Sequence, residues 1–170
     1  IDARVPGMVY ASIEQTPVIG GKPVSFDGTK AKSMPGVIDV VQIADGVAVV
    51  ADTYWHAYNA RKKGLTVKFE DGAVGGMSSA GMWAAIKSAE KDIKAIKIRP
   101  DVGDAAGAIA GAAKVVKANY TTAMMAHQPL EPMNMIADVQ GDKCDLTGPT
   151  QFQQGAQGTA AAVLGIKPEN

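Results

Sequence analysis

The sequence is poor in residues that hold metals or form cross-links. Among 170 residues there are one cysteine and two histidines. Cys144 alone cannot form an internal disulfide, an iron–sulfur site or a cysteine-rich zinc site. His56 and His127 lie far apart in the chain. We therefore expect no metal bound by protein ligands.

The sequence also has no surplus of charge and no long apolar run. Lys and Arg total 17 and Asp and Glu total 17, for a formal net charge of +0. This balance argues against a nucleic-acid partner, which favours a basic surface. No apolar run approaches the roughly 20 residues of a membrane-spanning helix, and residues 1–4 show no targeting leader. Localisation, periplasmic or cytoplasmic, stays open.

The composition is that of a folded globular protein. Hydrophobic residues make up 46% and charged residues 20%, which is enough apolar material for one core or two small ones. Ile1 is not an initiator methionine, and the chain stops at Asn170 directly after an Ala-rich segment. We expect the sequence to be a piece of a longer chain.

The first 70 residues favour a compact α+β unit. Asp45-Gly46 predicts a hairpin turn, Thr53 and Gly64 are typical helix caps, and Asp27 is expected to cap a shorter helix. The predicted order is strand, helix, hairpin, helix, strand, which suits α+β better than a regular βαβ array. The expected strands are 8–13, 37–43, 47–51 and 65–70, and the expected helices are 27–34 and 53–63.

A Gly-rich stretch, Asp71 to Met77, is typical of a linker. Beyond it the pattern predicts helices at 79–94, 104–110 and 155–164, the last ending at Gly165, and strands at 113–121, 135–140 and 143–147.

Residues 126–134 form an unusual segment, because two prolines stiffen a stretch that also holds His127 and Glu131. Loops of this kind often carry function. The simpler interpretation is that both side chains hydrogen-bond the loop backbone and hold its shape. By contrast, Gly20-Gly21-Lys22 lacks the remaining residues of a phosphate-binding loop, since Pro23 follows the lysine.

Pro149-Thr150-Gln151 lies between a predicted strand and a predicted helix. A side-chain amide at this place can project toward a ligand beside the free backbone N–H groups of the helix start. Most surface glutamines have no such role, so the residue pattern by itself leaves both interpretations of Gln151 open.

Four ordered stretches resemble the large subunit of the xanthine dehydrogenase and aldehyde oxidase family, closest to its isoquinoline 1-oxidoreductase beta-subunit branch. They are Gly7-Met8-Val9-Tyr10-Ala11, Pro35-Gly36-Val37 leading into Gly46-Val47-Ala48-Val49-Val50-Ala51-Asp52, His127-Gln128-Pro129-Leu130-Glu131-Pro132-Met133-Asn134, and Pro149-Thr150-Gln151. Trp55 and the helix around it match the segment that precedes the last strand of the family's first domain.

The resemblance implies an α/β hammerhead domain at 1–72, a linker and helical segment at 73–112, and the truncated start of a molybdopterin-binding α+β domain at 113–170. It implies that Gln151 donates a hydrogen bond to an oxo group of the molybdenum centre. Glu131 matches a carboxylate that organises the cofactor domain, and no catalytic or metal-ligating residue is expected in this chain. Gly155 and Gly158 would allow the backbone to approach the cofactor closely.

The resemblance further implies an oxidoreductase that hydroxylates an N-heterocycle or aldehyde with oxygen from water. Its molybdenum–molybdopterin cofactor, in the cytosine dinucleotide form, would pass electrons to [2Fe-2S] clusters on a partner subunit or domain. The family's later Gly-rich loop and catalytic glutamate are absent from these residues, so we expect this chain alone to be inactive, to hold no cofactor, and to be able to self-associate through open strand edges. The alternative is a non-catalytic hammerhead-type interaction or scaffold domain.

Overall fold

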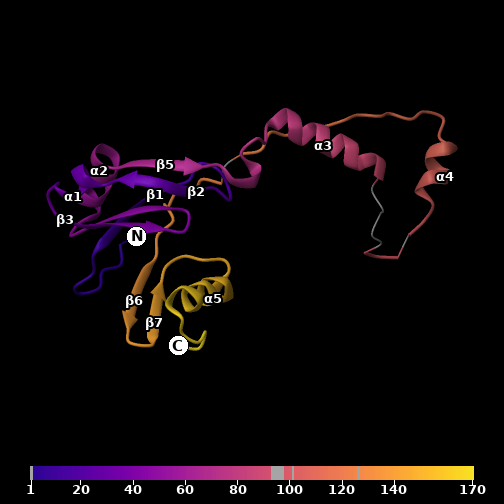
Figure 1. The fold of residues 1–170 in the computed structure, drawn as a ribbon. Helices are drawn as coiled ribbons and strands as arrows, with labels where there is room; N and C mark the ends of the chain where they lie inside the picture. The colour runs from indigo at the N-terminus through magenta and orange to yellow at the C-terminus, as the bar shows by residue number, and fades with distance from the viewer. Residues whose placement is uncertain (1, 93–97, 101, 126) are drawn as a thin grey trace. The chain divides into compact units, whose positions relative to one another are not determined.

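The computed structural model describes residues 2–92, 98–100, 102–125 and 127–170 (Figure 1). The chain divides into two compact units, Arg4–Asp104 and the pair of segments Ile1–Ala3 and Ala105–Asn170. Both contain helices and antiparallel strands, which confirms the predicted mixed α+β class.

A three-stranded antiparallel sheet of order β1-β4-β3 lies at the centre of the first unit. β1 (Tyr10–Gln15) and β3 (Val37–Ile43) flank β4 (Gly46–Ala51), whose residues are almost all buried because strands pair with both of its edges and α2 packs on it. The hairpin predicted at Asp45-Gly46 is confirmed, with Ile43 paired to Gly46.

A second antiparallel pair joins β2 (Lys22–Asp27) to β5 (Thr66–Glu70), with a bulge between Pro23 and Ser25. β5 was predicted and β2 was not. The Gly20-Gly21 turn leads into this strand rather than into a helix, and the ammonium of Lys22 pairs with the Glu70 carboxylate at 3.0 Å. The structure thus places the lysine in a surface ion pair.

Two helices, α1 (Thr29–Lys32) and α2 (Tyr54–Gly64), pack on the three-stranded sheet and on each other. Their contact is close, since a methyl group on Gly64 would collide with the Ala31 backbone. The core is built from small and β-branched side chains: Ala31, Val40, Val47, Val49 and Ala60.

Arg61 links α2 to β1 through polar contacts. Its Nε donates to the Ser12 hydroxyl at 2.9 Å, its guanidinium pairs with Glu14, and its Cζ lies 5.4 Å from the centre of the Tyr58 ring. Ser12 is buried, so this hydrogen bond satisfies a hydroxyl that water does not reach.

After β5 the predicted linker contains a short 3₁₀ helix, η1 (Gly72–Val74), followed by α3 (Ser79–Asp92). Most described side chains of α3 are exposed, and Met82 is half-buried. The predicted end of this helix, at Lys94, lies outside the described residues.

The second unit contains α4 (Ala105–Ala110), the antiparallel hairpin β6 (Ile136–Gln140) and β7 (Lys143–Thr147), and α5 (Gln153–Leu164). Gly165 ends α5 in the left-handed conformation with φ 68°, as the sequence predicted. Among the described side chains of α4, the hairpin and α5, Ala161 is the one that is buried.

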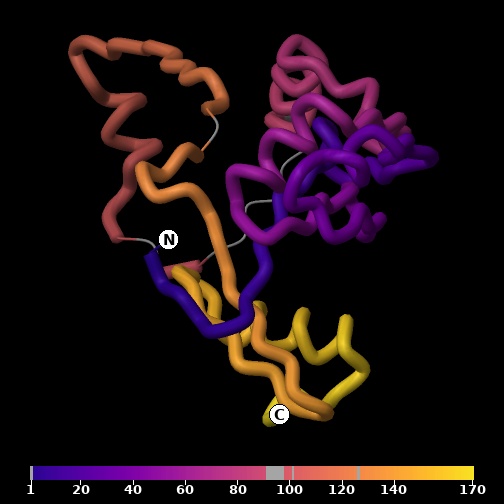
Figure 2. Tube along the Cα trace, turned by 90° about the vertical axis from the view of Figure 1, so that its left-hand side faces the viewer, coloured from indigo at the N-terminus to yellow at the C-terminus, as the bar shows by residue number. Residues whose placement is uncertain are grey.

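The strand predicted at Ala113 to Thr121 is wrong. These residues run as a long irregular trace between α4 and β6 (Figure 2), and Val116 and Tyr120 are 81% and 92% exposed. A stretch of β-prone residues forms a strand only where a neighbouring strand accepts its backbone hydrogen bonds. No strand of the described chain pairs with this segment.

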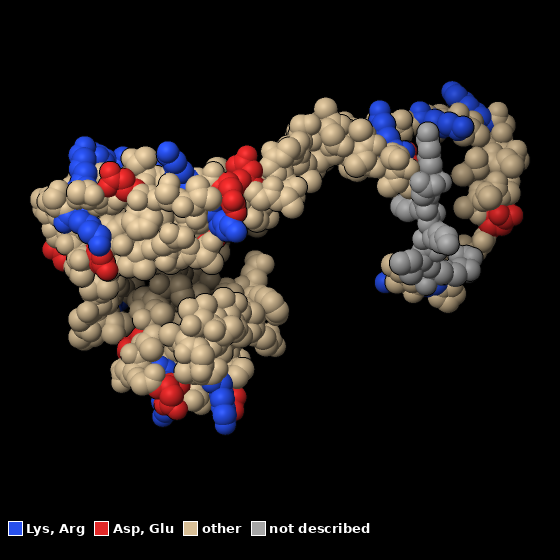
Figure 3. Space-filling view, in the orientation of Figure 1, with Lys and Arg blue, Asp and Glu red and all other residues tan. Residues whose placement is uncertain are grey.

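Basic and acidic side chains are scattered among uncharged ones on the face shown in Figure 3. Within the part of the chain that the structure describes, no helix is both long enough and apolar enough to cross a membrane.

Candidate functional site

Gln151 lies in the bend between β7 and α5 and is exposed. The Thr150 hydroxyl accepts a hydrogen bond from the Phe152 N–H at 3.0 Å, which fixes the turn around the glutamine. The Gln151 side-chain amide makes no hydrogen bond with any described residue. Its donors therefore remain available to a ligand.

The first turn of α5 offers further donors beside Gln151. The leading N–H groups of a helix have no acceptor inside the helix, and the N-cap residue, Phe152, makes no capping bond with its side chain. Gly155 leaves room for the Phe152 ring, with which a methyl group would collide, whereas Gly158 faces open space. We expected the backbone to approach the cofactor closely at both glycines, and the space that this needs is free at Gly158.

The loop of His127 and Glu131 belongs to the same unit and is exposed. The Asn134 amide donates to the Glu131 carboxylate at 3.4 Å and to the Pro132 carbonyl at 2.8 Å. Glu131 thus contacts a side chain of its own loop, whereas the simpler interpretation expected bonds to the loop backbone. His127 is exposed, and its role stays a prediction.

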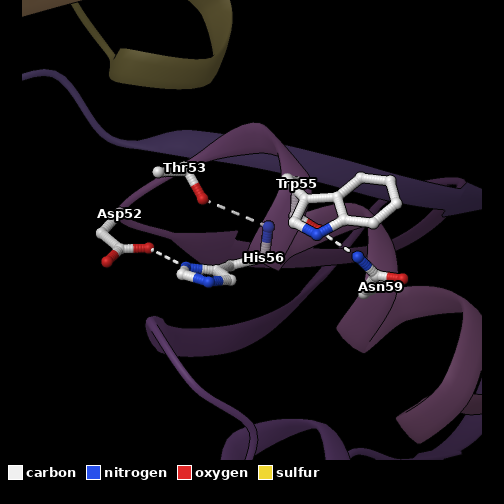
Figure 4. Close-up of polar contacts among 5 residues, drawn as sticks. All are labelled: Asp52, Thr53, Trp55, His56 and Asn59. Carbon is white, nitrogen blue, oxygen red and sulfur yellow. Dashed lines mark hydrogen bonds and ion pairs between the residues drawn. The ribbon is translucent and has the colours of Figure 1, made fainter.

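An acid–imidazole pair at the start of α2 was not found from the sequence (Figure 4). Asp52 follows β4, and its Oδ1 lies 2.6 Å from Nδ1 of His56. Thr53, the predicted N-cap, accepts a hydrogen bond from the His56 N–H at 3.2 Å. The spacing of four residues across a helix start was the available signal, because it places a carboxylate one turn before the imidazole.

Gly36 lies directly against this pair and is called its floor below. Its φ is 73°, its carbonyl accepts from the Asp52 N–H at 2.9 Å, and a methyl group there would collide with both the Asp52 carboxylate and the His56 ring. A glycine in the left-handed region therefore positions the pair.

Hydrogen bonds lower the pKa of three carboxyl groups in this unit. The His56 ring lowers the pKa of Asp52, the Lys32 ammonium lowers the pKa of Asp39, and the Thr29 backbone N–H lowers the pKa of Asp27. Each partner favours the charged carboxylate. All three groups are solvent-exposed, so these shifts reflect local hydrogen bonds at the protein surface.

No group of three or more His, Cys, Asp or Glu side chains that could hold a metal ion occurs among the residues the structure describes. The acid–imidazole pair belongs to the first unit, and Gln151 and Glu131 belong to the second. The described residues thus offer hydrogen-bond donors at Gln151 and the start of α5, and a paired imidazole at the start of α2.

Comparison with known proteins locates the cofactor-related part of the sequence. Residues 87–170 match the family model of the molybdopterin cofactor-binding domain. The chain is also 26% identical to the isoquinoline 1-oxidoreductase subunit beta of Brevundimonas diminuta over 187 aligned positions, which cover 99% of this chain and 22% of that relative. These matches confirm the resemblance found in the sequence. Part of the chain has the sequence of a molybdopterin cofactor-binding domain, and the chain is a relative of the beta subunit of isoquinoline 1-oxidoreductase.

Proposed function

We propose that these residues form part of the molybdenum-cofactor-binding subunit of a molybdenum hydroxylase. The observation that carries the proposal is the exposed, unbonded amide of Gln151 at the start of α5, inside the stretch that matches the cofactor-binding domain. An anionic pterin cofactor needs donors of this kind, and a helix start supplies them together with a positive dipole end.

The residues present fit such a cofactor. Gln151 would donate its side-chain N–H to an oxygen of the metal centre, while the first backbone N–H groups of α5 would face phosphate or pterin oxygens. Thr150 holds the turn that presents the glutamine, and Gly158 leaves space for a bound group. The bound cofactor would supply the two-electron redox chemistry, and the protein would orient it and exclude water.

The finer assignments belong to the same proposal. In the intact enzyme the cofactor is the cytosine dinucleotide form, electrons leave through [2Fe-2S] clusters of a partner subunit, and the substrate is an N-heterocycle or an aldehyde. Residues 1–72 form an α/β hammerhead domain, 73–112 a connecting segment, and 113–170 the start of the cofactor domain. The 170 residues alone are inactive and hold no cofactor, because a site assembled from several segments is not preorganised by one of them.

The test is the complete gene product. Molybdenum and pterin are measured in the purified protein, and oxidation of isoquinoline and of aldehydes is followed with an artificial electron acceptor. We expect bound molybdenum, activity toward one of these substrate classes, and loss of at least about tenfold in kcat on Gln151→Ala, as for removal of one positioned hydrogen-bond donor. The matched control is Gln140→Ala, at the opposite end of the β6–β7 hairpin, which should leave kcat unchanged.

A complete gene product without molybdenum would refute the proposal and leave the alternative of a non-catalytic scaffold domain. Equal kcat for Gln151→Ala and wild type in a molybdenum-loaded enzyme would refute the role of Gln151 alone. For the 170-residue chain, sedimentation should show self-association that rises with concentration, because β6 and β7 pair with no third strand among the described residues. A strict monomer at high concentration would contradict that expectation.

A further inference from the structure

Helix α2 has an unusual distribution of side-chain size. Its inner face, which packs on the sheet and on α1, carries the buried Ala57 and Ala60 and the close contact at Gly64. Its outer face carries large aromatic residues, with Tyr54 55% exposed and Trp55 67% exposed. A helix that only covered this sheet would place its large apolar side chains inward.

The outer aromatic side chains contact one another. The Trp55 ring stacks on Tyr58 with centroids 6.4 Å apart and an angle of 17° between planes, and Tyr54 lies 6.1 Å from Tyr58. Arg61 lies over Tyr58 in turn and is anchored to β1. We call Tyr54, Trp55 and Tyr58 the α2 aromatic face.

Further hydrogen bonds are made at the start of α2. Asn59 donates to the Trp55 carbonyl at 3.0 Å, and the His56 ring turns away from Trp55 to meet Asp52 (Figure 4). Trp55 is therefore exposed on a helix start that several hydrogen bonds stabilise. Trp and Tyr are enriched among the residues that contribute most to binding in protein interfaces, because they bury a large area at little cost in conformational entropy.

We infer that the α2 aromatic face is covered by another part of the same subunit's polypeptide, outside the 170 residues. This inference rests on the proposed function. The relative that this chain matches over 99% of its own length is covered to only 22%, so the proposed subunit contains a large amount of further chain that is available to cover this face. An aromatic surface on a convex helix suits a protein segment, since small-molecule sites are concave.

The test places a photo-crosslinker on this face of the complete gene product. Trp55 is replaced by p-benzoylphenylalanine, the protein is irradiated, and cross-linked peptides are identified by mass spectrometry. The matched control is the same replacement at Val24, which lies in the same unit and is 56% exposed. We expect Trp55 to give a cross-link within the same polypeptide to a peptide outside the 170 residues, in several-fold higher yield than Val24.

A cross-link from Trp55 to a different polypeptide, or to a second copy, would overturn the inference. So would a yield no higher than that of Val24, or a gene product without further residues. Molybdenum measured in the same sample separates the two proposals: loaded enzyme without the cross-link refutes this inference alone, and the cross-link without molybdenum refutes the proposed function alone.

A stability measurement supplies a second readout. Trp55→Ala should leave the urea midpoint of the 170-residue chain nearly unchanged, since the side chain is mostly exposed there, and should lower the midpoint of the complete subunit. Equal effects in the two proteins would contradict the inference.

Discussion

Replacement of Gly36 by alanine should destabilise the first unit by more than backbone strain alone. Gly36 has φ 73°, and a non-glycine residue in this region costs roughly 1–2 kcal/mol. The added methyl group would also collide with the Asp52 carboxylate and the His56 ring. Overpacking of this kind typically costs about 1–3 kcal/mol. The expected loss in free energy of unfolding is therefore about 2–5 kcal/mol.

Gly20→Ala is the matched control, because Gly20 has φ 79° and open space around its missing side chain. Its free energy of unfolding should fall only by the cost of the backbone strain, roughly 1–2 kcal/mol. Both tryptophans, Trp55 and Trp83, lie in the first unit, so urea unfolding followed by tryptophan fluorescence reports on that unit. Equal destabilisation by Gly36→Ala and Gly20→Ala would show that the methyl group meets no obstacle, and would refute the described floor of the acid–imidazole pair.

Three further predictions concern the same unit. Thr53→Ala should lower the free energy of unfolding by about 1 kcal/mol, because the His56 N–H loses its acceptor, while Thr53→Ser should retain it; urea midpoints compare the two. Val47→Ala should lower the free energy of unfolding by about 2 kcal/mol, since this side chain is 0% exposed. Val24→Ala on the surface should lower it little. Equal losses for the two variants would contradict the assigned core. The folded pKa of Asp52 is lowered, so its contribution to stability is present above the ordinary Asp pKa and is lost as pH falls through the folded value. Urea unfolding at pH values from 6 down to 3 should therefore show a flatter loss of stability for Asp52→Asn than for wild type.

Local sequence signals predicted the local parts of the fold. The bounds of β3 agree with the prediction, Thr53 caps α2, and Gly165 ends α5, because each depends on residues within one turn or one hairpin. Asp27 caps its helix in a modified way. Its carboxylate accepts from the Thr29 N–H at 2.9 Å, although Gly28 occupies the cap position.

The errors arose where structure depends on distant partners. β2 was missed because Gly21 and Pro23 indicate a turn, and only pairing with β5, some forty residues later, makes this stretch a strand. The strand predicted at 113–121 has β-prone residues and lacks a partner among the described strands. The place of Gln151 between a strand and a helix was predicted, and the structure shows it there. Its role toward the cofactor came from the family resemblance and stays a prediction. The Asp52–His56 pair was missed although its four-residue spacing is local; only its close neighbour Gly36 depends on the sheet.

The separation between β2 and β5 has a consequence for synthesis on the ribosome. The β3–β4 hairpin can form as soon as its two strands leave the exit tunnel, because its turn is local. β2 is made earlier but has no partner until Thr66–Glu70 emerges. Its backbone N–H and C=O groups therefore have no partner strand while the intervening residues are translated. Lys22, at the beginning of that waiting strand, places a charge on its exposed edge, a feature that discourages pairing with the wrong chain. The nascent protein thus reaches its closed two-sheet form only after β5 has been translated.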